Sequence, residues 1–287
     1  MTASTLIDGQ QPEITTASFK LDKQLEIFAM KWSMIFLGMW LALFFLSKYL
    51  MPLPQRWNIK KPFDAMIIRH RAISALHGFA AICLSGYYGL YELNFTCGKQ
   101  NTYTETFVVA HTGAFLLADF IYMLVNGFLD IGNLVHHMLG IVSYSYAFYT
   151  QKDLCYLAFH LFPGEISNIQ MNLREIFRKI GMRYTKTYFH NEFQYLTIYL
   201  LARMFWIPSI FYFIFTCPDA GIVIKILYPI HCLQSFYYCM QMLTLLRQRY
   251  AELQKLNKLG MKMNWFVGLS ETELEKVGIK HYSNFKA

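Results

Sequence analysis

The chain has 287 residues, of which 55% are hydrophobic, 17% are aromatic and only 15% are charged, and its formal net charge is +8. An average soluble domain carries about 25% charged residues. The deficit of charge excludes a disordered chain, a collagen-like chain and a highly charged coiled coil.

The charged residues stand in blocks, and seven long apolar gaps separate these blocks. A transmembrane helix needs about 20 apolar residues, and the gaps are nearly that long or longer. Open strands leave backbone groups unsatisfied in lipid, and the gaps lack the alternation of a barrel, so we predict helices. A soluble bundle would need a larger polar shell than the remaining residues supply. In chain order, the gaps are bracketed by Lys31 and Lys48, Arg71 and Glu92, Glu105 and Asp130, Asp130 and Lys152, Asp153 and Arg174, Glu192 and Asp219, and Lys225 and Arg247. The sequence therefore predicts an all-α fold, a polytopic transmembrane helical bundle of about seven spans.

Lysine and arginine concentrate in three segments, residues 48–71, 174–186 and 247–262. With seven spans, all three segments lie on one side of the membrane, which we call the basic side. Basic loops usually stay in the cytosol, so we expect the N-terminus on the opposite side. In a mitochondrial inner membrane the basic side would be the matrix. Because no nucleic-acid-binding motif accompanies the positive charge, we predict no nucleic-acid partner.

Both ends of the chain are predicted to be polar segments. Residues 1–30 form a polar N-terminal segment without the apolar run of a cleaved signal peptide, so we expect the first span to act as an uncleaved insertion signal. The C-terminal tail, residues 251–287, is predicted to be soluble. Ser270 and Glu273 have the spacing of a capping box, which predicts a short helix that ends near Gly278.

Six cysteines are present, and none has the spacing of a zinc site. Cys97, Cys155 and Cys217 lie near the side opposite the basic side. A disulfide among them in an oxidising lumen stays open, because connectivity cannot be read from sequence.

Polar and charged residues inside the spans gather in the half of the membrane nearer the basic side. A charged side chain in a bilayer is costly, so such residues usually face a cavity and have a role. We therefore predict a polar-headed cavity that opens toward the cytosolic leaflet. Adjacent helical residues point about 100° apart, so we expect one member of the His136–His137 pair to face this cavity and the other a neighbouring helix. The candidate residues are His77, Asp119, His136, His137, Glu165, Ser167, Asn168, Arg203, His231 and Gln234.

Structural roles are the alternative for each of these residues. A lone transmembrane histidine more often makes a hydrogen bond between helices than performs chemistry. Asp119 or Glu165 is alternatively one half of a structural ion pair with Arg203. His111 and His160 lie outside the shared depth, and we expect them at the membrane interface.

Histidine beside a carboxylate is typical of general acid–base catalysis in acyl transfer or hydrolysis, and such a histidine can also act as a nucleophile. Di-iron oxygenases need more clustered histidines than this chain holds, so we predict no metal site. The hydrolase pattern G-x-S-x-G and phosphate-binding glycine loops are absent. Acyl-lipid chemistry and non-catalytic lipid binding therefore remain open.

Three segments, taken in order, resemble the TLC-domain family. They are Arg71-Ala-Ile-Ser-Ala-Leu-His77, Asp119 followed by His136-His137, and Glu165-Ile-Ser-Asn168 with Arg174 downstream. The resemblance covers residues 65–250 as a TLC-type transmembrane domain with a six-helix core. It leaves residues 31–64, the first span and a basic loop, outside that core.

The resemblance implies a multi-spanning membrane protein, mostly found in the endoplasmic reticulum. The family includes ceramide synthases and relatives implicated in lipid sensing, membrane composition or protein trafficking. In the synthases a histidine pair lies at the acyl-transfer centre, and an aspartate pair lies on the following helix. This chain has Glu165-Ile-Ser-Asn168 in place of the aspartate pair, so it resembles the non-synthase members more closely.

These observations lead to one first expectation and two alternatives. We expect a protein that binds or regulates membrane lipids through an acyl-chain cavity. The alternatives are an N- or O-acyltransferase, with acyl-CoA as substrate and no other cofactor, and a structural accessory subunit of a membrane complex. The expected lipid-binding residues are His77, Glu165, Ser167, Asn168, Arg203, His231 and Gln234, and the catalytic residues of an enzyme would be His136, His137 and Asp119.

The expected partner is a membrane lipid or fatty acyl chain, and a homo-oligomer or larger membrane complex stays open. We expect a multi-pass protein of the endoplasmic reticulum, with other intracellular membranes, including the mitochondrial inner membrane, as alternatives.

Overall fold

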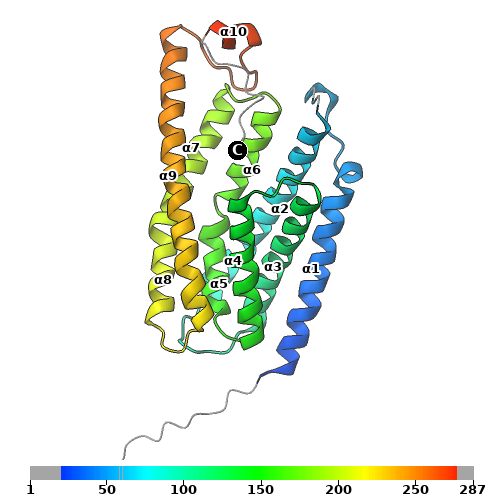
Figure 1. Cartoon of the computed structure of the whole chain (residues 1–287), viewed down its shortest axis with the longest axis vertical. Helices are drawn as coiled ribbons and strands as arrows, with labels where there is room; N and C mark the ends of the chain where they lie inside the picture. Colours follow the sequence, from blue (N-terminus) through cyan, green and yellow to red (C-terminus); the bar gives the residue numbers. More distant parts are fainter. Residues whose placement is uncertain (1–20, 58, 60, 277–287) are drawn as a thin grey trace, which may run out of the picture.

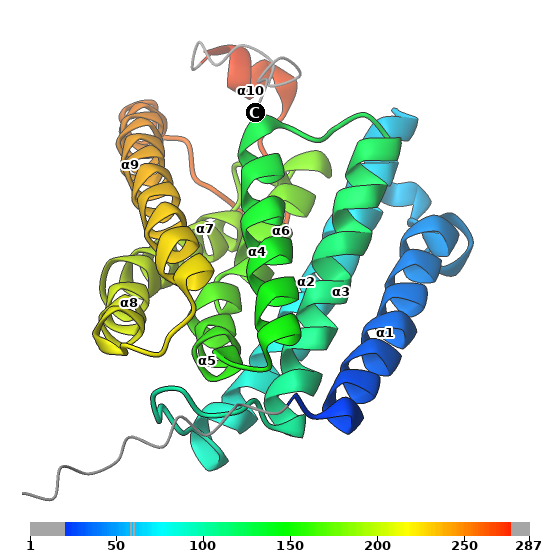
Figure 2. The ribbon, with the colours of Figure 1, turned by 60° about the horizontal axis from the view of Figure 1, so that its bottom comes forward.

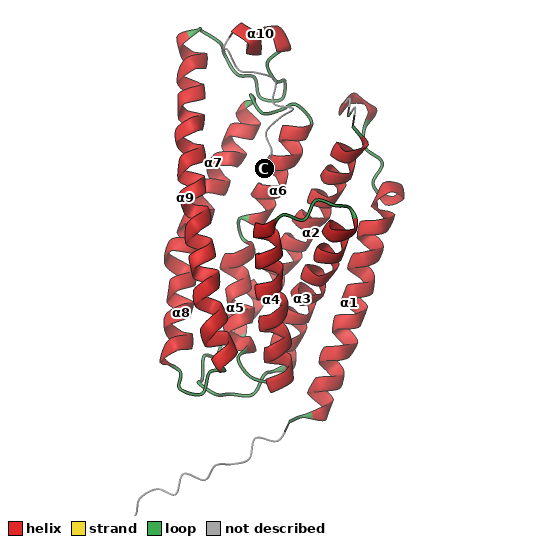
Figure 3. Ribbon diagram, in the orientation of Figure 1, coloured by secondary structure: helices red, strands yellow, loops and turns green. Residues whose placement is uncertain are grey.

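The computed structural model describes residues 21–57, 59 and 61–276. Figures 1 and 3 show that this part of the chain is a bundle of helices joined by short loops, without a strand. The elements are α1 (Lys23–Leu50), η1 (Gln55–Trp57), α2 (Pro62–Tyr91), α3 (Tyr103–Val125), α4 (Ile131–Thr150), α5 (Leu154–Glu165), α6 (Asn168–Lys179), α7 (Lys186–Leu201), η2 (Ala202–Trp206), α8 (Ile207–Thr216), α9 (Ile222–Lys258) and α10 (Glu271–Lys276).

Side-chain caps fix where several helices begin. Asp22 accepts a hydrogen bond from the backbone N–H of Gln24 (2.8 Å) at the start of α1. At the start of α3, Thr102 and Glu105 form a reciprocal capping box. The predicted box in the tail is also present, since the Ser270 N–H donates to Glu273 (2.8 Å). The predicted end of that helix, Gly278, and residues 1–20 lie outside the described residues.

Four helical segments are long and apolar enough to cross a membrane: α1, α2, α3 and the continuous segment Lys186–Thr216, which joins α7, η2 and α8. The remaining helices, or pairs of helices in line, which we call rods like the four above, are less apolar or shorter. α4 has 20 residues and carries the histidine pair, α5 and α6 have 12 residues each, and the C-terminal part of α9 is polar. The predicted all-α transmembrane bundle is confirmed, and the count of seven spans stays a prediction for α4, α5–α6 and α9.

In two of the helical segments, a proline that lacks a backbone donor lies near a local change in helix geometry. The fifth predicted span contains two helices, because α5 ends at Glu165 and α6 begins only at Asn168. Pro163 lies inside the last turns of α5 and cannot complete the helical ladder there. In the next rod, Pro208 follows the π-helical turn η2. Such single π turns are frequent at functional sites.

Helix α1 packs against α3 through large residues on one side and small residues on the other. Trp40 and Phe44 are almost fully buried on a stripe of small α3 residues, Ala110, Ala114 and Ala118. Residues four apart share one helix face, and small side chains let two helix backbones approach closely. The first span, which the sequence places outside the six-helix core, is therefore an integral part of the bundle.

The outer surface of the bundle is apolar. Large side chains such as Met34, Phe205 and Leu233 are about two-thirds exposed (67%, 69% and 70%). A contiguous apolar exterior of this kind suits contact with lipid rather than water.

The loops at the two ends of the bundle differ in chemistry. The α1–α2 connection, the α6–α7 turn and the end of α9, which carry the basic segments, all lie at one end of the bundle, the upper end in Figure 1. At the opposite end, Cys97 and Cys217 form a disulfide, with their Cα atoms 5.4 Å apart. This answers the open question about the cysteines, since Cys155 is free and buried.

Candidate functional site

The carboxylate of Asp119 on α3 bridges two histidines from neighbouring helices. Its Oδ1 lies 2.5 Å from Nε2 of His70 on α2, and its Oδ2 lies 2.9 Å from Nε2 of His137 on α4. All three side chains are buried. Asp119 thereby joins α2, α3 and α4 in the half of the bundle nearer the basic side.

The hydrogen-bond partners of His137 fix its protons. Its Nδ1 lies 2.7 Å from the backbone carbonyl oxygen of Asn133, which can only accept a hydrogen bond, so Nδ1 carries a proton. Its Nε2 faces a carboxylate oxygen of Asp119, so a second proton lies between these two atoms. Both ring nitrogens of His137 are therefore engaged in holding the ring.

His136 points in a different direction from His137, as predicted from the helical period. The planes of the two rings stand at 89° to each other. The His136 ring faces His231 on α9, with ring centroids 5.8 Å apart. No hydrogen bond joins His136 to another residue in the described ranges. Of the pair, His136 is thus the histidine with uncommitted ring nitrogens.

Arg203, in the π turn η2, is the centre of a second polar group. Its guanidinium lies 3.0 Å from Nε2 of His231, 3.3 Å from the hydroxyl of Ser235 and 3.0 Å from the carbonyl oxygen of Gly164. The break after α5 leaves that carbonyl without a helical partner, and Arg203 supplies one. The alternative of an ion pair between Arg203 and Asp119 or Glu165 is wrong, because neither carboxylate lies within ion-pair distance.

An apolar pocket of about 420 Å³ opens beside Arg203, between η2–α8 and α9. Figure 2 shows α8 and α9 side by side at the edge of the bundle, on the side away from α1. The lining residues Met204, Leu233 and Phe236 are exposed, so the pocket opens on the outer surface of the bundle. Its other lining residues are Arg203, Pro208, Phe211, Pro229 and Cys232.

Glu165 belongs to a third group, at the break between α5 and α6. One of its oxygens accepts a hydrogen bond from Asn168 (2.6 Å) and lies 3.8 Å from Nδ1 of His77. The His77 ring stacks on Phe115 with a centroid distance of 3.7 Å. The nearby Ser167 hydroxyl is buried and has no hydrogen-bond partner.

The predicted residues therefore form several separate polar groups and do not line one common cavity. Asp119 joins His137, Glu165 joins His77 and Asn168, and Arg203 joins His231. The side-chain amide of Gln234 instead donates to the carbonyl oxygen of Gly132 (3.0 Å) and fastens α9 to the start of α4. Their roles in binding or catalysis remain predictions.

Two expectations about histidines are wrong. His111 and His160, expected at the membrane interface, are both buried inside the bundle. His160 contacts the hydroxyl of Tyr228 (2.8 Å), and His111 stacks on His77 at 5.2 Å. The buried interior of the bundle therefore includes histidines outside the membrane half in which the candidate residues were predicted to gather.

Sequence reasoning missed His70, the closest partner of Asp119. His70 lies in a block of arginines and was grouped with the basic loop, whereas α2 begins at Pro62 and includes it. The available signal is the seven-residue spacing to His77, which places both histidines on one helix face. His77 lies 15 residues into α2, because the helix begins at Pro62, before the bracketing Arg71.

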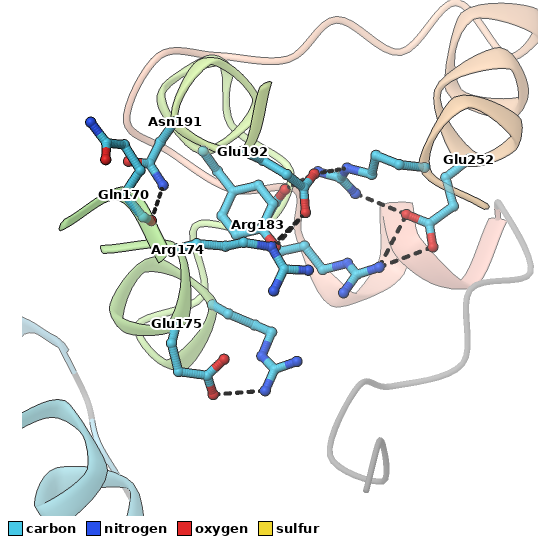
Figure 4. Close-up of polar contacts among 10 residues, drawn as sticks. Gln170, Arg174, Glu175, Arg183, Asn191, Glu192 and Glu252 are labelled. Carbon is cyan, nitrogen blue, oxygen red and sulfur yellow. Dashed lines mark hydrogen bonds and ion pairs between the residues drawn. The ribbon is translucent and has the colours of Figure 1, made fainter. Parts of the chain in front are cut away.

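A network of buried and partly buried ion pairs ties α6, α7 and α9 together at the basic end (Figure 4). Glu192 on α7 accepts from Arg174 on α6 (2.8 Å) and pairs with Arg249 on α9 (3.0 Å). Arg249 also contacts Glu252 (2.8 Å), which in turn pairs with Arg183 (3.0 Å). The network fixes the extension of α9 beyond the apolar part of the bundle.

No group of three or more His, Cys, Asp or Glu side chains in the described residues has a geometry that could hold a metal ion.

The family model of the TLC domain (TRAM, LAG1 and CLN8) matches residues 67–247, which is more than half of the chain. No curated protein matches significantly. The matched region begins in α2 and ends in α9, and it includes the three polar groups described above. The chain is therefore a membrane protein of the TLC-domain family.

Proposed function

We propose that this protein binds a membrane lipid, with an acyl chain in the pocket between η2–α8 and α9. The pocket itself is the observation that supports this function. Its volume, about 420 Å³, falls in the range of small-molecule sites, about 300 to 1,000 Å³. All of its lining residues except Arg203 are apolar or weakly polar.

The surroundings of the pocket favour a lipid over a water-soluble ligand. The rim residues Leu233 and Phe236 are exposed on α9, among other apolar residues of the outer surface. In a membrane, acyl chains cover this surface and have direct access to the pocket. A chain that enters it replaces loose lipid contacts by packing against fixed side chains.

An acyltransferase is the second candidate, and His136 is the observation that favours it. Its ring nitrogens have no hydrogen-bond partner among the described residues, which leaves them free to act as a base or nucleophile. His137 is a poorer candidate, because its two nitrogens already contact Asn133 and Asp119.

The endoplasmic reticulum is the proposed location. The disulfide between Cys97 and Cys217 supports it, because it lies at the end opposite the basic segments and disulfides persist in oxidising compartments. Fluorescence microscopy of the tagged full-length chain with organelle markers tests this location.

The lipid that co-purifies in mild detergent tests the proposed binding. Mass spectrometry of the purified full-length protein should find a bound lipid that is absent from a detergent blank. Cys232→Phe adds a ring inside the pocket and should reduce that lipid several-fold. Cys83→Phe is the matched control, because Cys83 is exposed on α2 outside the pocket, and it should leave the lipid unchanged.

Two results would contradict the proposal. Equal lipid content in Cys232→Phe, Cys83→Phe and the unaltered protein would show that the pocket does not hold the lipid. Alternatively, incubation with long-chain acyl-CoA and an amine or alcohol acceptor could release CoA and form an acylated product. Loss of that activity in His136→Ala would favour the enzyme over the binding protein.

A further inference from the structure

Arg203 carries a positive charge within a transmembrane rod and has no carboxylate partner among the described residues. Its guanidinium contacts only neutral groups: His231, Ser235 and the carbonyl oxygen of Gly164. The ring of Tyr199 lies 5.3 Å away and adds a weak cation–π contact. Glu165, which directly follows Gly164 in the chain, accepts a hydrogen bond from Asn168 and lies in no ion pair with Arg203.

One donor of Arg203 is unused. Its Nε is buried and has no hydrogen-bond partner. Buried donors nearly always have a partner, and a guanidinium presents a planar fork that matches carboxylate and phosphate oxygens. Arg203 is thus a charged lining residue of the pocket whose guanidinium has no anionic partner among the described residues, and an anion from outside the chain would supply one.

Arg203 lies within the hydrocarbon core, in the half nearer the basic side. The rod Lys186–Thr216 ends 13 residues after Arg203, so Arg203 lies about 20 Å from the end opposite the basic side. The hydrocarbon core is about 30 Å thick, which places Arg203 in the half nearer the basic side. Arg203 and the apolar residues line one pocket, so a single ligand can contact both.

We propose that the pocket selects lipids with an anionic group, a carboxylate or a phosphate, which binds Arg203 while an acyl chain fills the apolar part. This inference rests on the proposed lipid binding and names the chemical class of the ligand. The carboxylate would come from a free fatty acid and the phosphate from an anionic phospholipid.

Matched lipid pairs test the inference on the purified full-length protein in neutral detergent. The first pair is palmitic acid and hexadecanol, and the second is phosphatidic acid and diacylglycerol with the same chains. Binding is measured by native mass spectrometry above the pKa of both acids. In at least one pair, the charged member should bind about ten- to a hundredfold more tightly, the usual range for hydrogen bonds to charged groups. The pair that shows the preference identifies the source of the anion.

Variants at Arg203 separate charge recognition from a structural role. Arg203→Gln should abolish the preference for the charged lipid, and Arg203→Lys should retain part of it because the charge remains. Lys225→Gln, which removes a positive charge near the start of α9 outside the pocket, should leave the preference unchanged.

The outcomes distinguish this inference from the function on which it rests. Equal binding of charged and neutral lipids to the unaltered protein overturns the inference and leaves lipid binding in place. A preference that Arg203→Gln retains, in protein that still unfolds cooperatively, also overturns it. Failure of every lipid to bind overturns the proposed function itself.

Discussion

Two adjacent histidines show how neighbouring residues acquire different tasks. Both ring nitrogens of His137 form hydrogen bonds, one with Asn133 and one with Asp119. Neither ring nitrogen of His136 forms a hydrogen bond with another described residue. Substitution of the first removes protein–protein hydrogen bonds and leaves the Asp119 carboxylate with one partner fewer. Substitution of the second removes no such bond.

We therefore expect His137→Ala to lower the free energy of unfolding by about 1 to 3 kcal/mol, the cost of leaving a buried polar group unsatisfied. Thermal unfolding in detergent, followed by near-ultraviolet circular dichroism, measures the change. His136→Ala is the control and should shift the midpoint much less. An equal loss in both variants would show that the Asp119 contacts contribute nothing special to stability.

At the scale of elements, ion pairs hold the helices together at the basic end, whereas apolar packing holds them together in the rest of the bundle. The segment Lys186–Thr216 has 31 residues and α9 has 37, lengths of about 46 and 55 Å. Both exceed a hydrocarbon core of about 30 Å, so their polar ends extend past it on the basic side. Glu192 holds these extensions together through two arginines from different helices.

Glu192→Gln should thus destabilise the extension strongly. It leaves the buried Arg249 and the partly buried Arg174 without their shared carboxylate, and breaking a buried ion pair costs about 3 to 5 kcal/mol. Glu175→Gln is the matched control, because among the described residues Glu175 pairs only with Arg178, one turn away on α6, a contact of about 0 to 1 kcal/mol. Limited proteolysis should cut near the end of α9 faster in Glu192→Gln than in Glu175→Gln. Equal cutting rates would refute a clamping role for Glu192.

The same elements show what the sequence could reveal. The helical rods were predictable, because the length of an apolar run is a local property that bilayer thickness makes meaningful. The break at Glu165 was not, since proline is tolerated in transmembrane helices and its effect depends on neighbouring helices. His70 and Glu192 were assigned to loops or span boundaries because adjacent charges obscured the helix ends. The pocket at Arg203 depends on how two rods pack, which no single segment encodes.

For the whole molecule, the disulfide and the basic segments predict opposite environments at the two ends. Cysteine-accessibility labelling of one site in the loop after Asn94 and another in the C-terminal tail should give labels from opposite sides of the membrane. Labelling of both from one side would contradict the seven-span topology.

The disulfide itself can be tested by two cysteine substitutions. Cys97→Ser removes a link between positions 120 residues apart, which should cost about 2 to 5 kcal/mol if the link restricts the unfolded chain. Cys155→Ser changes a free buried cysteine and leaves the link intact. A non-reducing gel should therefore resolve a faster, compact band for Cys155→Ser and a slower band for Cys97→Ser.

The alanine stripe on α3 determines where a shortened version of this protein can begin. The family match begins at residue 67, after α1 has ended, yet Trp40 and Phe44 of α1 cover Ala110, Ala114 and Ala118. A fragment that starts at the family boundary would lack α1 and would expose these alanines, with His111 on the same helix, to lipid. The region that matches the family model therefore begins later in the sequence than the region that packs as one bundle. The packed bundle begins at α1.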